Sequence, residues 1–185
     1  MRKDKPSVLR GIVTGVAAGI VATLIMDQFQ KLSTAGGKTL EKQKKLAEGE
    51  SPSQIAQEQA ASEQKAASQE GSTEIVARKI AEATGTHLNK EDKKTAGQAV
   101  HYTFGTLMGV VYGVSSELLP EVTTGAGTAY GTLLFLAADE IAIPAFQLSP
   151  SPASTPATDH LQHWAAHVVY GGSLELVRSL LRRIL

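Results

Sequence analysis

Apolar and polar stretches alternate along this chain in a way that is typical of a membrane protein. Apolar residues dominate four stretches, at about residues 8–30, 98–119, 123–146 and 160–182. A helix that crosses a bilayer needs about 20 mostly apolar residues. The fourth stretch is the weakest, because only residues 164–174 are apolar, and only if His167 is ignored. The pattern predicts an all-α fold: a four-helix transmembrane bundle with a polar helical or disordered segment between helices 1 and 2.

Glycines recur at every fourth position within these apolar stretches, as at Gly105, Gly109 and Gly113. Glycine destabilises a water-exposed helix by about 1 kcal/mol relative to alanine. A series on one helical face is therefore favoured where a second backbone approaches closely, as in the GxxxG seams of membrane helices. We expect helix packing, within one chain or between copies in a homo-oligomer, through Gly11, Gly15, Gly19, Gly105, Gly109, Gly113, Gly127, Gly131 and Gly171.

A short internal repeat relates the second stretch to the fourth. Residues 110–118 read VVYGVSSEL and residues 168–176 read VVYGGSLEL, identical at seven of nine positions. The first and third stretches also correspond, because Gly19 precedes Asp27 by the same spacing as Gly131 precedes Asp139. We interpret the repeat as a duplication and predict two related helical hairpins.

The segment between the first two stretches is polar and divides the chain into three parts. Residues 32–96 are rich in Ala, Gln, Glu, Lys and Ser, which favours short solvated helices. Asn89 is placed to cap a helix that continues into the second apolar stretch. The predicted parts are residues 1–31 with transmembrane helix 1, the extramembrane segment 32–96, and residues 97–185 with helices 2–4.

Basic residues flank both ends of the apolar part of the chain. By the positive-inside rule both termini are cytoplasmic and residues 32–96 lie on the outer side of the membrane. The N-terminus also resembles a signal peptide, but the length of its apolar run and the lack of an A-x-A site favour a retained anchor. The residues that carry this prediction are Arg2, Lys3, Lys5 and Arg10 at the start and Arg178, Arg182 and Arg183 at the end.

Composition removes several classes of function. The formal net charge is zero, which argues against a nucleic-acid partner, and no cysteine is present, which excludes thiolate catalysis and Cys-ligated metal sites. The mean hydropathy of -0.07 resembles that of a soluble protein, but it averages a polar middle with apolar ends. A soluble four-helix protein therefore stays an alternative to the membrane bundle.

Ionisable residues within the apolar stretches are the candidate functional groups, because burying them at membrane depth is costly. Helical spacing places most of them toward the outer side, where we expect one cluster that accepts protons, handles an ion or a small solute, or simply ties helices together through hydrogen bonds. Its predicted members are Asp27, His101, Asp139, Glu140, His163 and His167. At the inner side, Glu175 and Glu117 are expected to form ion pairs with Arg178 or Arg182.

Metal and haem binding are alternatives for the same histidines. His163 and His167 have the i, i+4 spacing that allows two imidazoles to share a divalent cation, but Trp164 stands where a metalloprotease has its glutamate. Haem needs opposed histidines across a wide pocket, which disagrees with closely packed glycine seams. No cofactor is expected, although a divalent metal is retained as an alternative. No catalytic residue is predicted, and the chain is not expected to be an enzyme.

Four motifs resemble a known family. MDQFQKL, AGQAVHYTFGTLMGVVYG, LFLAADEIAIPAFQLSP and HWAAHVVYGGSLELVR are similar to the small bacterial inner-membrane proteins of the YagU-like family, a domain of unknown function. The resemblance covers the apolar stretches and not residues 32–96. It implies a multi-pass protein of the bacterial inner membrane and supplies no site residues.

Two functional hypotheses follow. In the first, the outer Asp/His cluster handles protons, ions or a small solute. In the second, the protein is a non-enzymatic structural or partner-binding membrane protein that acts through residues 32–96.

Overall fold

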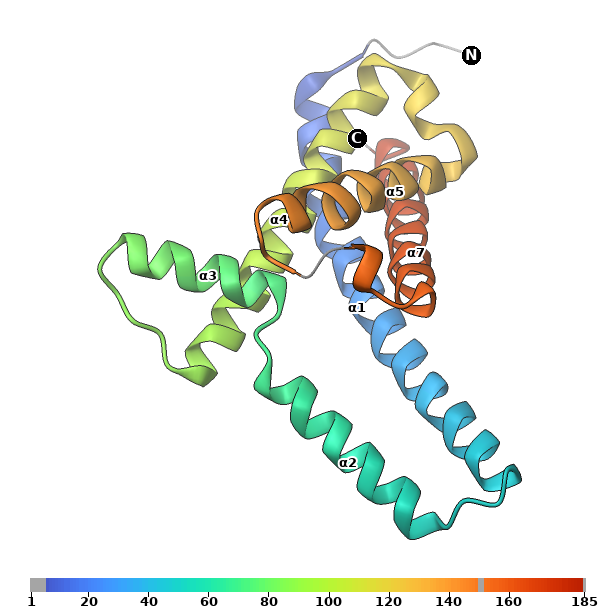
Figure 1. Cartoon of the computed structure of the whole chain (residues 1–185). Coiled ribbons are helices and arrows are strands. Elements are labelled where there is room, and N and C mark those ends of the chain that lie inside the picture. The colour runs from blue at the N-terminus through green and yellow to red at the C-terminus, as the bar shows by residue number, and fades with distance from the viewer. Residues whose placement is uncertain (1–5, 150–151, 185) are drawn as a thin grey trace.

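The computed structural model describes residues 6–149 and 152–184, and this part of the chain is helical with no strand (Figure 1). The predicted all-α class is confirmed. Arg2, Lys3 and Lys5, which entered the topology prediction, lie outside the described residues. In chain order the elements are α1 (Val8–Ala47), α2 (Pro52–Ser68), α3 (Ser72–Ala83), α4 (Lys90–Leu118), the 3-10 segment η1 (Pro120–Gly127), α5 (Thr128–Phe135), the π-helical η2 (Leu136–Ala142), α6 (Ile143–Ala145), the 3-10 turn η3 (Pro152–Ser154) and α7 (Ala157–Arg182).

Helices α1 and α4 pack against each other in opposite directions, backbone against backbone. A Cβ atom on Gly11 would lie 2.7 Å from the carbonyl oxygen of Gly113, and one on Gly15 would lie 2.6 Å from that of Gly109. Both distances are too short for a real side chain, so any larger residue would push the helices apart. Three glycines on each helix thus form one close seam, which Gly19 and Gly105 complete.

Helices α5 and α7 also pack in opposite directions through glycine. A Cβ atom on Gly171 would lie 2.9 Å from the nitrogen and 3.0 Å from the Cα of Gly131, and Gly127 also faces Gly171. On α7 the next position along the seam is a histidine, since Gly131 faces the backbone of His167. This second seam therefore has fewer glycines than the first.

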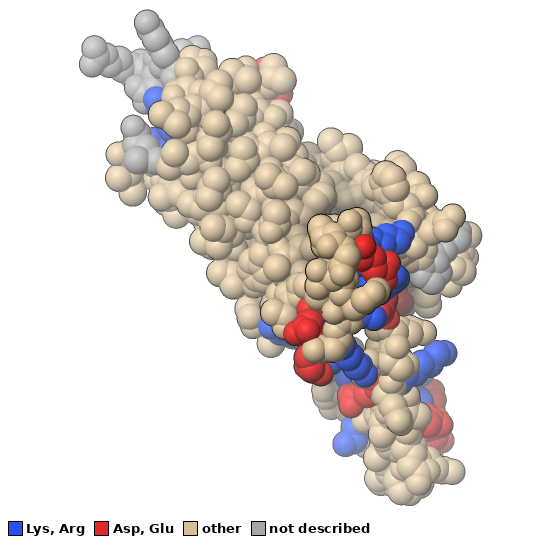
Figure 2. All heavy atoms as spheres, turned by 90° about the vertical axis from the view of Figure 1, so that its left-hand side faces the viewer, with Lys and Arg blue, Asp and Glu red and all other residues tan. Residues whose placement is uncertain are grey.

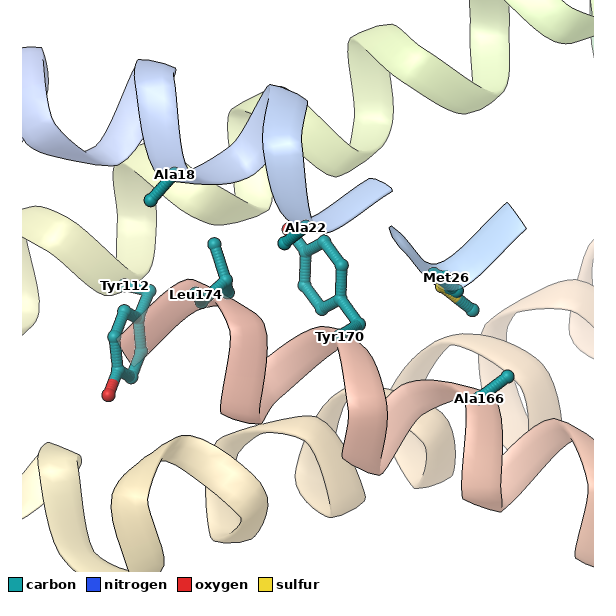
Figure 3. Close-up of a cluster of buried hydrophobic side chains, with 7 residues drawn as sticks. All are labelled: Ala18, Ala22, Met26, Tyr112, Ala166, Tyr170 and Leu174. Carbon is teal, nitrogen blue, oxygen red and sulfur yellow. The ribbon is translucent and has the colours of Figure 1, made fainter. Parts of the chain in front are cut away.

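Small and aromatic side chains join the two helix pairs along α1 and α7. Figure 3 shows Tyr170 and Leu174 of α7 directed toward α1, where alanines leave room for them. The buried cluster consists of Ala18, Ala22, Met26, Tyr112, Ala166, Tyr170 and Leu174. Because cores are packed to crystalline density, this cluster fixes how α1 and α7 lie against each other.

Tyrosines fill the space between α4 and its neighbours. The rings of Tyr112 and Tyr130 lie 4.9 Å apart, and the Tyr130 hydroxyl donates to the carbonyl oxygen of Met108 at 2.8 Å. The Tyr170 hydroxyl donates to the carbonyl oxygen of Gly105 on α4. Each buried hydroxyl is therefore paired, as burial requires.

The structure corrects the predicted limits of several helices. Helix α1 runs without interruption to Ala47, so the predicted boundary at residues 31–32 falls inside it. Asn89 caps α4 as predicted, because its side chain accepts from the backbone N–H of Asp92. The third stretch becomes α-helical only at Thr128 rather than at residue 123, because Gly125 and Ala126 have positive φ angles.

The polar segment forms two attachments to this bundle. The end of α1 and all of α2 extend away from it as an arm (Figure 1), connected by ion pairs of Lys38 with Glu63 and of Lys45 with Glu58. Helix α3 instead packs against the start of α4, where Gly97 leaves space for Glu74.

Apolar side chains also cover the outside of the bundle. Figure 2 shows a broad face that is almost free of Lys, Arg, Asp and Glu, with charged residues gathered toward the polar segment and a few at the opposite end. By length and apolar composition, the segments Val8–Ala47 and Pro120–Ala145 are each able to cross a membrane. Among the exposed apolar residues of α1 and α4 are Ile12, Val13, Val16, Ile20, Val21, Leu24, Ile25, Phe104, Leu107 and Val111.

Candidate functional site

Antiparallel packing brings the predicted acids and histidines to one end of the bundle, which we term the histidine end. It is formed by the middle of α1, the first half of α4, the segment η2 and the first half of α7. The side chains there fall into three contact groups rather than one cluster. The residues of the histidine end are Asp27, His101, Tyr102, Asp139, Glu140, His160, His163 and His167.

The first group joins α1 to α4. Asp27 Oδ1 lies 2.9 Å from Nε2 of His101, and its other oxygen accepts the hydroxyl of Tyr102 at 2.8 Å. The rings of His101 and Tyr102 meet edge to face. Both carboxylate oxygens therefore have a short hydrogen bond, as in a carboxylate that holds two helices together.

The second group joins η2 to α7. Asp139 Oδ2 lies 3.5 Å from Nδ1 of His163 and 3.8 Å from Nδ1 of His167. The second distance is too long for a direct hydrogen bond, and Nδ1 of His167 donates instead to the carbonyl oxygen of His163 at 2.9 Å. The side chain of His163 is 56% exposed, that of Asp139 20% and that of His167 9%. This group therefore connects the protein surface with a buried imidazole.

The π-helical turn of η2 contributes to this placement. Asp139 and Glu140 both lie within it. A π-helical turn widens the backbone locally and occurs frequently at functional sites. Here two adjacent carboxylates contact different histidines of the same helix, Asp139 facing His163 and His167 while Glu140 faces His160.

The third group contains a histidine that the sequence analysis did not select. His160 Nδ1 lies 2.6 Å from Glu140 Oε1, and Nε2 donates to the carbonyl oxygen of Pro152 at 3.0 Å. Both partners offer acceptor oxygens, so these contacts favour the form of the ring in which both nitrogens donate. The sequence feature that could have identified His160 is its spacing, because His160, His163 and His167 lie on one helical face.

The geometry does not support a metal centre. Across residues 6–149 and 152–184, no three or more His, Asp or Glu side chains are positioned to hold a metal ion. The Nδ1 atoms of His163 and His167 are directed at Asp139 and at a backbone carbonyl. The alternative in which these two histidines share a cation therefore has no support from their arrangement.

The opposite end of the bundle holds the predicted inner ion pairs. Arg178 donates to both oxygens of Glu175 at 2.8 Å, and the Tyr112 hydroxyl donates to the same carboxylate. Arg182 pairs with the buried carboxylate of Glu117. Both predicted pairs are present, and their buried charges are matched, which keeps the cost of burial down.

Comparison with known proteins gives a family but no activity. Residues 52–176, more than half of the chain, match the family DUF1440, described as a protein of unknown function. The chain belongs to this DUF1440 family. A search of curated proteins gave no match, and neither did a search of solved structures. The YagU-like resemblance is not part of this result.

The extent of the DUF1440 match changes one expectation. It includes α2 and α3, so it covers most of the polar segment that the resemblance left out. It begins after α1, which places Asp27 outside the matched range and Asp139 within it, together with all three histidines of α7.

Proposed function

We propose that this chain is a multi-pass membrane protein whose helices α1, α4 and α7 and the segment 120–145 cross the bilayer as two related antiparallel hairpins. The uncharged stretch between Arg10 and Asp27 is about 25 Å long at the helical rise of about 1.5 Å per residue, close to the hydrocarbon thickness of about 30 Å. Its outward side chains are apolar, as lipid contact requires and as water-exposed surfaces rarely show.

The orientation follows from charge. Arg10, Arg178, Arg182 and Arg183 lie at the end opposite the histidines. Under the positive-inside rule this is the cytoplasmic end. In a bacterial inner membrane, the histidine end and residues 48–89 then face the periplasm.

Within this framework the protein handles protons at the histidine end. The observation that carries the proposal is the position of Asp139 between the exposed His163 and the buried His167. Imidazole gains and loses a proton near neutral pH. A carboxylate between two imidazoles stabilises the charged form of either one, so positive charge can pass from the surface ring to the buried ring.

The contrast with Asp27 supports this assignment. Both oxygens of Asp27 have short hydrogen bonds, whereas Asp139 Oδ2 lies at longer distances, 3.5 and 3.8 Å, from the nitrogens of its two histidines. A group with unused acceptor capacity is better suited to accept a proton than one whose capacity is filled. In this proposal Asp139 accepts and releases protons, whereas Asp27 stabilises the contact between α1 and α4.

Reconstitution into liposomes tests the proposal. Protein in liposomes that contain a pH-sensitive dye is exposed to a potassium diffusion potential, which drives protons inward. The wild-type protein should acidify the interior faster than empty liposomes do. Asp139→Asn should lower the rate by about tenfold or more, because a charged member of the path is removed.

The matched control is Asp92→Asn, which makes the same chemical change at an exposed position near the start of α4. It should leave the rate near that of the wild-type protein. Equal rates for the wild-type protein and Asp139→Asn, or no rate above empty liposomes, would contradict proton handling at this site.

The arm supports a second candidate function, recognition of a partner. It extends beyond the bundle (Figure 1) and exposes Leu32 and Leu40. Replacing residues 36–68 with a flexible linker removes most of this arm and keeps α3. Proton flux should survive this change under the first proposal, whereas any cellular phenotype of the gene deletion should fail to be complemented under the second.

A further inference from the structure

Helix α3 has an unusual position relative to the uncharged surface of the bundle. It packs against α4 at Gly97, where an added Cβ would lie 2.8 Å from Glu74 Cγ and 3.0 Å from its Cα. Gly97 lies about one helical turn before His101, whose partner Asp27 ends the uncharged stretch of α1. Helix α3 is therefore attached where the apolar surface gives way to charged residues.

A second contact holds α3 at this level. Nζ of Lys79 donates to the carbonyl oxygen of Phe146, directly after α6, at 3.5 Å. Figure 1 shows α3 running across the direction of α4 and α7 rather than along it. A helix in this orientation, at the border of the apolar surface, has the geometry of a helix that lies in a membrane interface.

The side chains of α3 are divided between two flanks. At 100° per residue, Val76, Ile80 and Ala83 lie on one flank, and Arg78 and Glu82 on the other. The buried Ala77 between them faces α4. Ile80 is 57% exposed, so residues 6–149 and 152–184 leave the apolar flank uncovered at this position.

We infer that α3 is an interfacial helix whose Val76–Ile80–Ala83 flank contacts the boundary between headgroups and acyl chains of a phospholipid leaflet. This rests on the membrane location in the proposed function. Phe146, which is also strongly exposed, lies beside it and extends the same apolar border. Lys79 follows the apolar flank on the helix surface, and its contact with the Phe146 carbonyl keeps its ammonium group at the level of this border.

Quenching of tryptophan fluorescence by brominated lipids tests this contact. Trp164 is the only tryptophan, so Trp164→Phe gives a background without tryptophan emission. Ile80→Trp in this background reports on α3, and Ala83→Trp is a second probe of the same flank if the first variant folds poorly. Both should be quenched more strongly by bromine near the headgroup end of the acyl chain than by bromine near its terminus.

Two further probes separate the possible failures. Val16→Trp lies on the outward face of α1 and should be quenched by bromine deeper in the bilayer, whereas Leu40→Trp on the arm should show little quenching. No quenching of Val16→Trp would overturn the membrane location itself. Quenching of Val16→Trp together with unquenched α3 probes would overturn only the interfacial helix, and blue-shifted but unquenched emission would indicate that a second copy covers the flank.

Discussion

The two helix pairs of this protein use the same kind of crossing for different purposes. Extending the repeat of residues 110–118 and 168–176 toward the start of each helix aligns Gly105 with His163 and Gly109 with His167. In the first pair these positions are glycines that allow backbone contact with α1. In the second pair they are imidazoles that face Asp139.

The comparison shows what a packed helix gains and loses at a seam position. A glycine contributes close packing and offers no chemistry. A histidine at the same place still lets Gly131 approach its backbone and also puts a titratable side chain inside the bundle. The first pair, with its continuous seam, is therefore expected to supply the stability that lets the second pair carry titratable groups.

The largest expected effect is the loss of the first seam. A Cβ on Gly109 would lie 2.5 Å from Gly19 Cα and 2.6 Å from the carbonyl oxygen of Gly15. These atoms are backbone and cannot rotate away, so Gly109→Ala should destabilise the protein by about 3 kcal/mol, the upper end of the usual cost of overpacking. Thermal unfolding in detergent, followed by circular dichroism, measures the change.

Gly172→Ala is the control for helix propensity, because no atom of the described residues lies within 4 Å of a Cβ at that position on α7. Alanine is the better helix former, so this variant should be as stable as the wild-type protein or more so. Equal stability of Gly109→Ala and the wild-type protein would show that α1 and α4 do not make this seam.

A smaller effect separates the two aspartates. Asp27→Asn should lower stability by about 2 kcal/mol, because hydrogen bonds from His101 and Tyr102 lose their charged acceptor. Asp139→Asn should change stability less, since its contacts are longer. Denaturant unfolding of both variants in the same detergent checks the order.

Under the proposed function, proton flux should show the opposite order. Asp139→Asn should be the more damaging change, and Asp27→Asn should stay close to the wild-type rate once equal amounts of folded protein are compared. Tyr102→Phe should reproduce part of the stability loss of Asp27→Asn. If Asp27→Asn abolished flux without loss of stability, the division of roles between the helix pairs would be wrong.

Local sequence patterns predicted much of the fold. Glycine spacing selected the residues that lie at both seams, because a four-residue period on a helix places them on one face whatever the partner is. Asn89 was recognised as a cap because capping depends only on the residues that follow it. The Glu–Arg pairs of α7 and α4 followed from their position at the helix ends.

Features that depend on three-dimensional contact were harder to predict. The continuation of α1 to Ala47 has no apolar signal, since its last turns are polar and are held by ion pairs with α2. The π-helical turn at Asp139 has no sequence signature, and it decides which carboxylate meets which histidine. His160 was missed because it lies at the polar edge of α7, where its partner Glu140 comes from another segment.

The smallest expected effect concerns how α3 is attached. Glu70 links the two sides of this attachment, with one oxygen near Lys93 Nζ of α4 and the other 2.9 Å from Arg78 Nε of α3. Hydrogen bonds from Lys93 and Arg78 hold the pKa of Glu70 below its usual 4.5. The pKa of Glu70 is lower in the folded state than in the unfolded state, so Glu70 stabilises the folded state fully at pH values above 4.5. This stabilisation is lost as the pH falls through the lowered pKa of the folded state.

Acidification should therefore loosen α3 from α4 while leaving the bundle intact. Because the chain has no cysteine, a dye attached to Ala83→Cys labels this position alone. Its fluorescence anisotropy should stay constant from neutral pH down to about pH 4.5 and fall as the pH is lowered further, through the lowered pKa of Glu70. Glu70→Gln should lower the anisotropy at neutral pH and remove most of the pH dependence, whereas Glu58→Gln on the arm should do neither. Since Glu70 is partly exposed and screened by solvent, the change should be modest. A pH response that survives Glu70→Gln would assign it to another carboxylate.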